Sequence, residues 1–316
     1  MKKKCFFTQQ RGTFRTLLST RLDSLGIKET QNTELSDLNF INSYEKSLNK
    51  RAVNILLLIE PKSVMPEIYE TDYWAGFDAV VALGRYRAEK YGLNHWIDLP
   101  FDLDYKSWAT RNRKTIVMVN ASKYSANRDS LYSLRRKVLT LDAYNSHNIQ
   151  LFGDHWNENR VMETRRRVAA FRKQTATNIL EYSHKECWSE FGKKYPQHLG
   201  KMDGDFKQII SAKLAIVIEN EADYVSEKIW TYLNRGVVPV YVGPDLAFHE
   251  YIKDFVFVAK PEAEEVLNII QSVGTTSIES KIKNYRDFVA TFDPKSRLES
   301  TLDNLLKSVL RILGLS

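Results

Sequence analysis

Short runs of consecutive apolar residues alternate along the chain with longer segments of helical periodicity. The runs are rich in β-branched and aromatic residues, as expected of strands covered on both faces. They lie at residues 53–59, 77–83, 115–119, 149–152, 214–219, 237–242 and 255–258, with a further candidate at 4–8. Helical patterns fill residues 11–25, 129–144 and 160–190. This order of elements predicts an α/β protein with parallel sheets.

The interval from Asp154 to Lys213 interrupts this alternation because it contains no convincing strand. A chain of 316 residues is also long enough for two domains. We therefore expect two Rossmann-like domains, residues 1–155 and 156–316, facing a cleft in which ligands meet the carboxyl ends of the strands. A single doubly wound sheet is the alternative.

The charge and cysteine content of the chain indicate which partners and which cellular compartment to expect. Lysine and arginine outnumber aspartate and glutamate by 46 to 39, which gives a formal net charge of +7 and favours phosphates or anionic surfaces as partners. Only two cysteines occur, no apolar run is long enough to cross a membrane, and the amino terminus lacks the core of a signal peptide. We expect a cytoplasmic protein.

Common catalytic signatures are missing from the sequence. It has no glycine-rich dinucleotide motif, P-loop, zinc-protease motif or hydrolase elbow, and its six histidines show no metal spacing. Two Asp-X-Asp triplets, at 102–104 and 203–205, could hold a divalent ion on a sugar nucleotide. Such a triplet arises by chance about once in a chain of this length, so solvated loop carboxylates are the favoured interpretation.

The densest polar cluster is ENEADYVSEKIW at residues 219–230, after an apolar strand and before a helix expected to end at Gly236. Tyr224, Glu227 and Lys228 are expected in the first turn of this helix, with Tyr224 and Lys228 on one face. Amide groups at a helix N-terminus and a lysine both attract phosphate. The polar face of an amphipathic helix is the alternative interpretation of these residues.

Residues 212–251 resemble the donor-binding core of the α-1,3-fucosyltransferases of glycosyltransferase family 10, whose pattern reads F-E-N-S, a short loop, D-Y-[IV]-T-E-K, then G, V-P-V and G. The spacing from Lys228 to Gly236, Pro239 and Gly243 matches as well. Weaker similarity extends to other parts of the chain, at residues 53–78, 96–102, 116–153 and 255–290.

The resemblance implies a GT-B fold with an N-terminal acceptor domain and a C-terminal domain that binds GDP-fucose. It places Asn220 at the donor site, Tyr224 beside the nucleotide or sugar, Glu227 on the ribose and Lys228 on the phosphates. Glu60, at the end of an apolar strand, matches the acceptor-side glutamate that acts as general base.

The family also has an arginine that contacts the donor phosphates. In this sequence it maps most closely to Arg136, with Arg135 and Arg128 as competitors.

The expected reaction is an inverting transfer of fucose from GDP-fucose to a hydroxyl of a glycan acceptor. Lysine, arginine and the helix N-terminus can stabilise the departing diphosphate, so no cofactor or metal is required, although a divalent ion could stimulate the reaction. Glu221 stands where the family has Ser or Thr, and a carboxylate there could change the sugar. Transfer of another nucleotide sugar is therefore the alternative.

Two further interpretations concern partners. The basic stretch around Arg165 to Arg167 suggests a nucleic-acid binder, but no nucleic-acid-binding motif accompanies it, so we expect no nucleic-acid partner.

In residues 301–316, leucines recur at helical spacing beside Lys307 and Arg311. Packing against the protein body explains this stripe, and peripheral contact with the inner membrane is the alternative.

Overall fold

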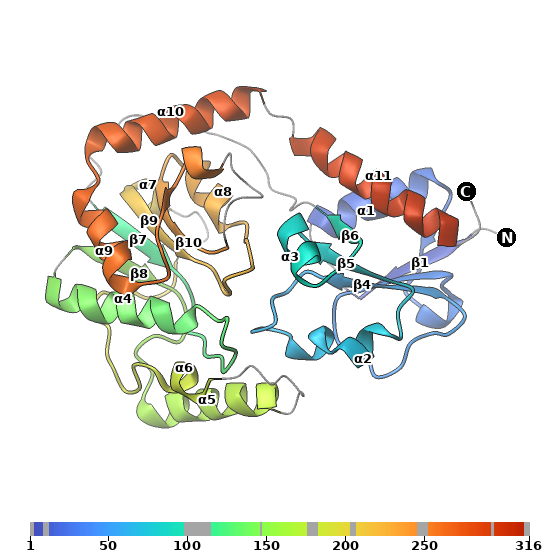
Figure 1. Cartoon of the computed structure of the whole chain (residues 1–316), viewed down its shortest axis with the longest axis horizontal. Helices are drawn as coiled ribbons and strands as arrows, with labels where there is room; N and C mark the ends of the chain where they lie inside the picture. Colours follow the sequence, from blue (N-terminus) through green and yellow to red (C-terminus); the bar gives the residue numbers. More distant parts are fainter. Residues whose placement is uncertain are drawn as a thin grey trace. The chain divides into compact units, whose positions relative to one another are not determined.

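The computed structural model describes residues 3–8, 13–97, 115–145, 147–175, 183–202, 207–244, 252–291 and 294–312. The chain forms two compact units (Figure 1). The first unit consists of Met1–Pro100 and Asp293–Ser316, and the second of Phe101–Phe292. The predicted α/β class with two parallel, Rossmann-like sheets is confirmed.

The division between the units differs from the expected one. It lies near residue 100 instead of residue 155, and the carboxyl-terminal helix belongs to the first unit. The strands at 115–119 and 149–152 pair within the second sheet. An apolar strand pattern shows that a strand is buried but not which sheet it joins, so the sequence could not assign these two strands.

The first unit is built on a parallel sheet of six strands in the order β2-β1-β3-β4-β5-β6. Its strands are β1 (Lys4–Phe7), β2 (Lys28–Glu29), β3 (Leu38–Ile41), β4 (Val53–Leu58), β5 (Ala79–Leu83) and β6 (His95–Ile97). Its helices are α1 (Thr13–Ser24), α2 (Thr71–Trp74), α3 (Arg85–Lys90) and α11 (Pro294–Ile312), with 3₁₀ turns at η1 (Thr33–Leu35) and η2 (Pro66–Tyr69). The sequence analysis missed β3, although all four of its residues are buried, because the run is short and contains Asn39.

Helices α1 and α11 supply apolar side chains to one core of this unit. Leu18 and Leu22 of α1 and four residues of α11 are almost fully buried against inward-facing residues of β1, β3, β4, β5 and β6. The four residues are Leu302, Leu305, Leu306 and Val309. The leucine stripe of the carboxyl-terminal helix is therefore used in packing, as one of the two interpretations predicted.

Shortening Leu306 to alanine should lower the free energy of unfolding of the first unit by about 2–5 kcal/mol, because a side chain that is 2% exposed would leave a cavity. Leu25→Ala is the matched control, since Leu25 is 47% exposed, and should change stability little. Urea unfolding measures both variants. Equal stability of the Leu306 variant and the wild type would contradict the packing of α11.

The second unit is built on a parallel sheet in the order β11-β10-β9-β7-β8. Its strands are β7 (Thr115–Val119), β8 (Ile149–Phe152), β9 (Ala212–Ile218), β10 (Val238–Val242) and β11 (Phe257–Val258). Its helices are α4 (Tyr132–Asn145), α5 (Arg160–Thr175), α6 (His184–Trp188), α7 (Lys207–Ile210), α8 (Lys228–Leu233), α9 (Ala263–Ser272) and α10 (Thr275–Thr291).

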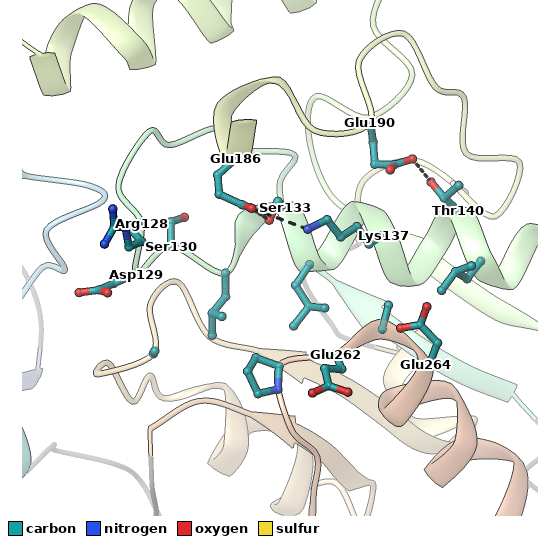
Figure 2. A pocket seen from close by; sticks show the side chains of 16 residues that line it. Arg128, Asp129, Ser130, Ser133, Lys137, Thr140, Glu186, Glu190, Glu262 and Glu264 are labelled. Carbon is teal, nitrogen blue, oxygen red and sulfur yellow. Dashed lines mark hydrogen bonds and ion pairs between the residues drawn. The ribbon is translucent and has the colours of Figure 1, made fainter. Parts of the chain in front are cut away.

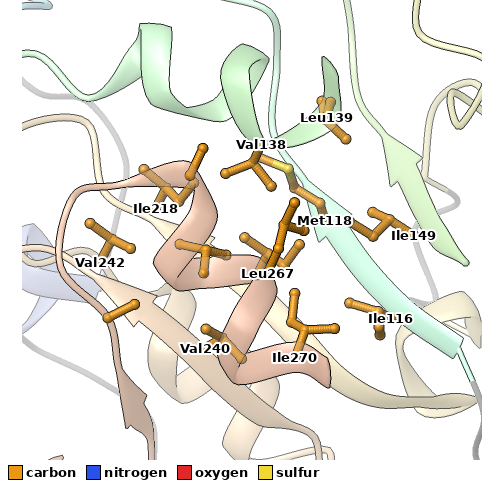
Figure 3. Packing of buried hydrophobic residues seen from close by; sticks show 14 of the residues in the cluster. Ile116, Met118, Val138, Leu139, Ile149, Ile218, Val240, Val242, Leu267 and Ile270 are labelled. Atoms are coloured by element: carbon orange, nitrogen blue, oxygen red, sulfur yellow. The ribbon is translucent and has the colours of Figure 1, made fainter. Parts of the chain in front are cut away.

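Helices cover both faces of this sheet. On one face, α4 and α9 bury Val138, Leu139, Leu267 and Ile270 against apolar side chains of β7, β8, β9 and β10 (Figure 3). On the other face, α8 and α10 pack against alternate residues of the same strands. Because the loops after β7 and β9 follow adjacent parallel strands, they meet at one edge of the sheet.

Two predicted helices have different bounds in the structure. The helical pattern of residues 160–190 corresponds to α5, which ends at Thr175, and to α6, which begins after Ser183. The Ser183 hydroxyl accepts a hydrogen bond from the Glu186 amide and so caps a new helix. The helix expected from Tyr224 is shorter as well, because α8 begins only at Lys228.

Candidate functional site

The loops that follow β7 and β9 are joined to each other at the carboxyl edge of the second sheet. The Leu131 amide donates to the Asn220 carbonyl at 3.0 Å, and the Ala222 amide donates to the Asp129 carbonyl at 3.1 Å. Between them, Ser130 and Glu221 form an antiparallel bridge. The two loops therefore form one continuous surface above the central strands.

Glu221 helps to hold these loops together. Its carboxylate accepts a hydrogen bond from the Asn127 side-chain amide at 3.0 Å, and Glu221 is only 1% exposed. The sequence analysis considered this residue a possible determinant of the sugar because it replaces Ser or Thr. Its position within the loop pair indicates a structural role.

Lys228 lies at the first residue of α8, beside the end of β7. Its Nζ atom donates to Oδ1 of Asn120 at 3.0 Å. Burial of the ammonium group, with a smaller contribution from the positive charge of Arg135, lowers the pKa of Lys228 to about 8. At neutral pH the side chain is therefore a charged group in poorly solvated surroundings, where an anion would be strongly attracted.

Asn120, which the sequence analysis did not single out, accepts this hydrogen bond. Its backbone amide donates to the Phe152 carbonyl at 3.0 Å, and its carbonyl accepts from Nε1 of Trp156 at 2.6 Å. Gly153 has φ +132°, and a Cβ atom there would lie 2.2 Å from the Asn120 carbonyl oxygen. Asn120 directly follows an apolar strand and Asn220 comes two residues after another, and this similar position was a signal that could have identified Asn120.

Of the three candidate arginines, Arg135 lies beside the loop of the polar cluster. Nε and Nη2 of Arg135 donate to the Ile218 carbonyl at 3.1 and 2.5 Å, and Nη2 also donates to Oδ1 of Asn220 at 3.0 Å. Arg135 is 2% exposed and stacks on the Tyr132 ring. It thereby fixes the side chain of Asn220, one of the predicted donor residues.

The side chain of Arg136 is bound by backbone carbonyls and does not contact Asn220 as Arg135 does. Its guanidinium group donates to the carbonyls of Lys123, Glu186 and Ser189 at 2.8, 3.3 and 3.2 Å. It is 1% exposed and stacks on Tyr124. Because all three of its nitrogens already donate to protein carbonyls, Arg136 is less suited to bind phosphate than the sequence analysis expected.

Arg128 is the exposed member of the three. It lies on the loop before α4, two residues before the bridge formed by Ser130 and Glu221. Within the described residues its guanidinium group has no hydrogen bond or ion pair. It is therefore available to an anionic ligand.

Tyr224 and Glu227 precede α8, so they do not lie in the first turn of the helix as predicted, and Tyr224 does not share a helix face with Lys228. Tyr224 is 9% exposed, whereas Glu227 is exposed. The physical reason is that the Ser226 amide donates to the Glu219 carboxylate at 2.9 Å, which keeps residues before Glu227 in a loop. The helix α8 has six residues and begins at Lys228, whose side chain brings a positive charge to its first position.

Glu60 lies in the first unit, just after β4, and is half-buried. Its backbone carbonyl accepts hydrogen bonds from the Tyr69 hydroxyl at 2.6 Å and from Nη1 of Arg87 at 3.4 Å. Within the described part of the chain its carboxylate has no hydrogen bond or ion pair. The backbone of Glu60 is thus fixed, whereas its carboxylate is not engaged by the described residues.

A cavity of about 660 Å³ lies between α4, α9 and the segment from Glu186 to Glu190 in the second unit (Figure 2). Five carboxylates and only two cations line it, and Glu186 forms an ion pair with Lys137 at 3.7 Å. In Figure 2, Glu262 and Glu264 lie on the side opposite Glu186. This excess of negative charge makes the cavity unsuitable for a diphosphate.

The basic stretch at 165–167 does not form a positively charged face. Arg167 is fully buried and pairs with Glu163, and Arg166 donates to the Ser122 carbonyl at 2.6 Å and to Glu158. Only Arg165 is exposed. This arrangement offers no support for nucleic-acid binding.

The described residues contain neither a candidate metal site nor a candidate membrane-spanning helix. No group of three or more His, Cys, Asp or Glu side chains there could hold a metal ion. Both Asp-X-Asp triplets, at 102–104 and 203–205, lie outside these residues. No helix in the described ranges is both long and apolar enough to span a bilayer.

Two parallel Rossmann-like sheets, with the polar loops at the carboxyl edge of the second, define the GT-B fold of glycosyltransferases. No protein-family model matches the sequence, and no curated protein matches it. HepE of Anabaena in complex with UDP-glucose superposes with a TM-score of 0.58 at 15% identity, covering 96% of this chain and 99% of that chain. A glycosyltransferase from Rickettsia africae gives a TM-score of 0.53 at 14% identity over the full length of both chains.

An α1,3-fucosyltransferase also aligns with the chain, with a TM-score of 0.48 and 14% identity over 91% of this chain and 80% of that chain. The comparisons therefore establish the fold of the protein, which agrees with the resemblance found in the sequence, but not a single family within it.

Proposed function

We propose that this protein is a glycosyltransferase whose second unit binds a nucleoside diphosphate sugar. The observation that carries the proposal is the poorly solvated Lys228 ammonium group at the carboxyl edge of β7 and β9, in a GT-B fold. In open α/β sheets this edge is where ligands bind. A cation with little water around it is suited to a diphosphate.

The donor contacts follow from these positions. Lys228 binds the diphosphate, whereas Arg128 lines the acidic cavity beside α4. Arg135 fixes Asn220 at the rim. Glu227 is exposed and can accept hydrogen bonds from the ribose hydroxyls, while Tyr224 lies beside the nucleotide or sugar.

The proposed reaction is an inverting transfer. The Glu60 carboxylate takes the proton of the acceptor hydroxyl, whose oxygen attacks the anomeric carbon on the face opposite the diphosphate. The bond between that carbon and the diphosphate oxygen breaks, and the oxygen keeps the electron pair. Lys228 stabilises the negative charge on this oxygen, so the chemistry needs no metal.

For the sugar donor we propose GDP-fucose and a glycan as acceptor. The support is the sequence resemblance at residues 212–251, including the order Asn220, Tyr224, Glu227 and Lys228. A second candidate is another nucleotide sugar on the same fold, and the complex of HepE with UDP-glucose favours this alternative.

Thermal unfolding with GDP-fucose, GDP-mannose and UDP-glucose tests the donor. A ligand that binds only the native state adds about 2.7 kcal/mol of stability at one hundred times its Kd, so we expect the largest rise in Tm with GDP-fucose. A larger rise with UDP-glucose would select the alternative. No rise with any nucleotide sugar would refute the donor site.

A further inference from the structure

The carboxylate of Glu219 closes the loop that carries the proposed donor residues. Glu219 is the first residue after β9 and is fully buried. Its backbone amide donates to the Val242 carbonyl, and its Oε1 atom accepts the Ser226 amide, both at 2.9 Å. The side chain thus connects the end of the sheet to the residue that lies two positions before Lys228.

The second oxygen of this carboxylate, Oε2, is buried, and so is the hydroxyl of Tyr241 on the adjacent strand β10, which interacts with Glu219. Burial, followed by the negative charge of the Glu219 carboxylate, raises the pKa of Tyr241 well above its usual value. A Cβ atom at Gly243 would lie 2.2 Å from that hydroxyl and 3.0 Å from Cγ of Glu219, so only glycine leaves room for both groups. A fully buried carboxylate is unfavourable in its charged form unless positive charge lies nearby.

That positive charge comes from the proposed donor site. Burial raises the pKa of Glu219, and the positive charges of Lys228 and Arg135 act against this rise and favour the carboxylate. The other charged groups that act on Lys228 are Lys123, on the loop after β7, and Glu227. Since Glu227 is exposed, Glu219 is the buried negative charge that opposes the two neighbouring cations.

We propose that Glu219 is a positioning residue of the donor site: its carboxylate fixes the start of α8 through Ser226 and acts as the counter-ion that keeps the Lys228 ammonium charged. The importance of this for donor binding rests on the proposed function. To bind a diphosphate, the Lys228 side chain must be correctly positioned and protonated. Glu219 favours both, and because it is fully buried it does not contact the ligand itself.

Two substitutions separate these roles. Glu219→Gln keeps an oxygen that can accept the Ser226 amide but removes the charge. Glu219→Asp keeps the charge but shortens the side chain by one methylene group, which breaks the hydrogen bond to Ser226. The first variant should therefore change the titration of Lys228, and the second should change the affinity for nucleotide.

The titration is measured without ligand, by NMR of the ¹³C-methylated lysines, with Lys228→Met to assign the signal. In Glu219→Gln we expect the midpoint of Lys228 to fall by about one pH unit, which at pH 8 reduces the protonated fraction from about one half to about one tenth. Glu163→Gln, which removes a buried carboxylate paired with Arg167, is the control and should leave the midpoint unchanged.

An unchanged midpoint in Glu219→Gln would overturn the counter-ion role. The affinity of Glu219→Asp for GDP and UDP, measured by calorimetry, should fall about tenfold, the effect of losing one hydrogen bond to a charged group. Wild-type affinity would overturn the positioning role, and this test remains if Glu219→Gln does not fold. Should neither nucleotide bind the wild type, the proposed function fails, while the titration still decides the counter-ion role.

Discussion

Replacing Lys228 with methionine is expected to weaken the binding of GDP by about 10- to 100-fold, because a hydrogen bond to a charged group contributes about 1.5–3 kcal/mol. Methionine retains the volume of the aliphatic stem, so the packing of α8 should survive. Turnover should fall as well, since charge grows on the leaving diphosphate in the transition state. Calorimetry with GDP and a transferase assay measure the two effects.

The same lysine should give nucleotide binding a pH dependence. Burial lowers the pKa of Lys228 to about 8, and only the protonated form attracts the diphosphate, so affinity should decline as pH rises through about 8. The Lys228→Met variant should lack this decline. Lys213→Met, at the other end of β9, is the control, and a loss of affinity equal to that of Lys228→Met would contradict the assignment.

Replacing Glu60 with glutamine should lower kcat by about 10²- to 10⁴-fold, the usual contribution of a general base. An amide cannot take the proton of the acceptor hydroxyl. The hydrogen bonds that Tyr69 and Arg87 donate to the Glu60 carbonyl do not involve the Glu60 side chain, so they should be preserved. Initial-rate kinetics with saturating donor and acceptor measure the change.

Donor binding separates loss of the base from loss of structure. Because Glu60 belongs to the first unit and Lys228 to the second, the affinity of Glu60→Gln for GDP should remain that of the wild type. Glu89→Gln removes an exposed carboxylate of the same unit that pairs with Arg85, and it should retain full turnover. Near-normal kcat in Glu60→Gln would exclude this residue as the base.

Much of the fold could be predicted because buried parallel strands are continuous apolar runs. The strands at 115–119 and 149–152 were predicted to the residue. Strand β3 was not predicted because Asn39 interrupts its apolar run. The side chain of Asn39 is buried and forms hydrogen bonds with Ser36 and Asn54. Such hydrogen bonds join residues from different elements, and a local pattern does not reveal them.

The candidate site was predicted in part. Asn220 and Lys228 lie at the carboxyl edge of the second sheet, whereas Arg136 was favoured over Arg128 although its guanidinium group is fully engaged by backbone carbonyls. Arg135 and Arg136 lie within α4 and Arg128 lies on the loop before it, a difference that the sequence alone did not show. Only the surroundings of each guanidinium group show which one is engaged by the protein.

The sequence by itself determined the α/β class, the parallel strands and the position of the polar cluster, since all of these depend on residues close together in the chain. Tertiary structure alone decided which sheet each strand joins, that α11 packs on the first unit, and that Asn120 accepts a hydrogen bond from Lys228. These features depend on contacts between residues far apart in sequence. Burial, which lowers the pKa of Lys228, arises only when those residues are brought together.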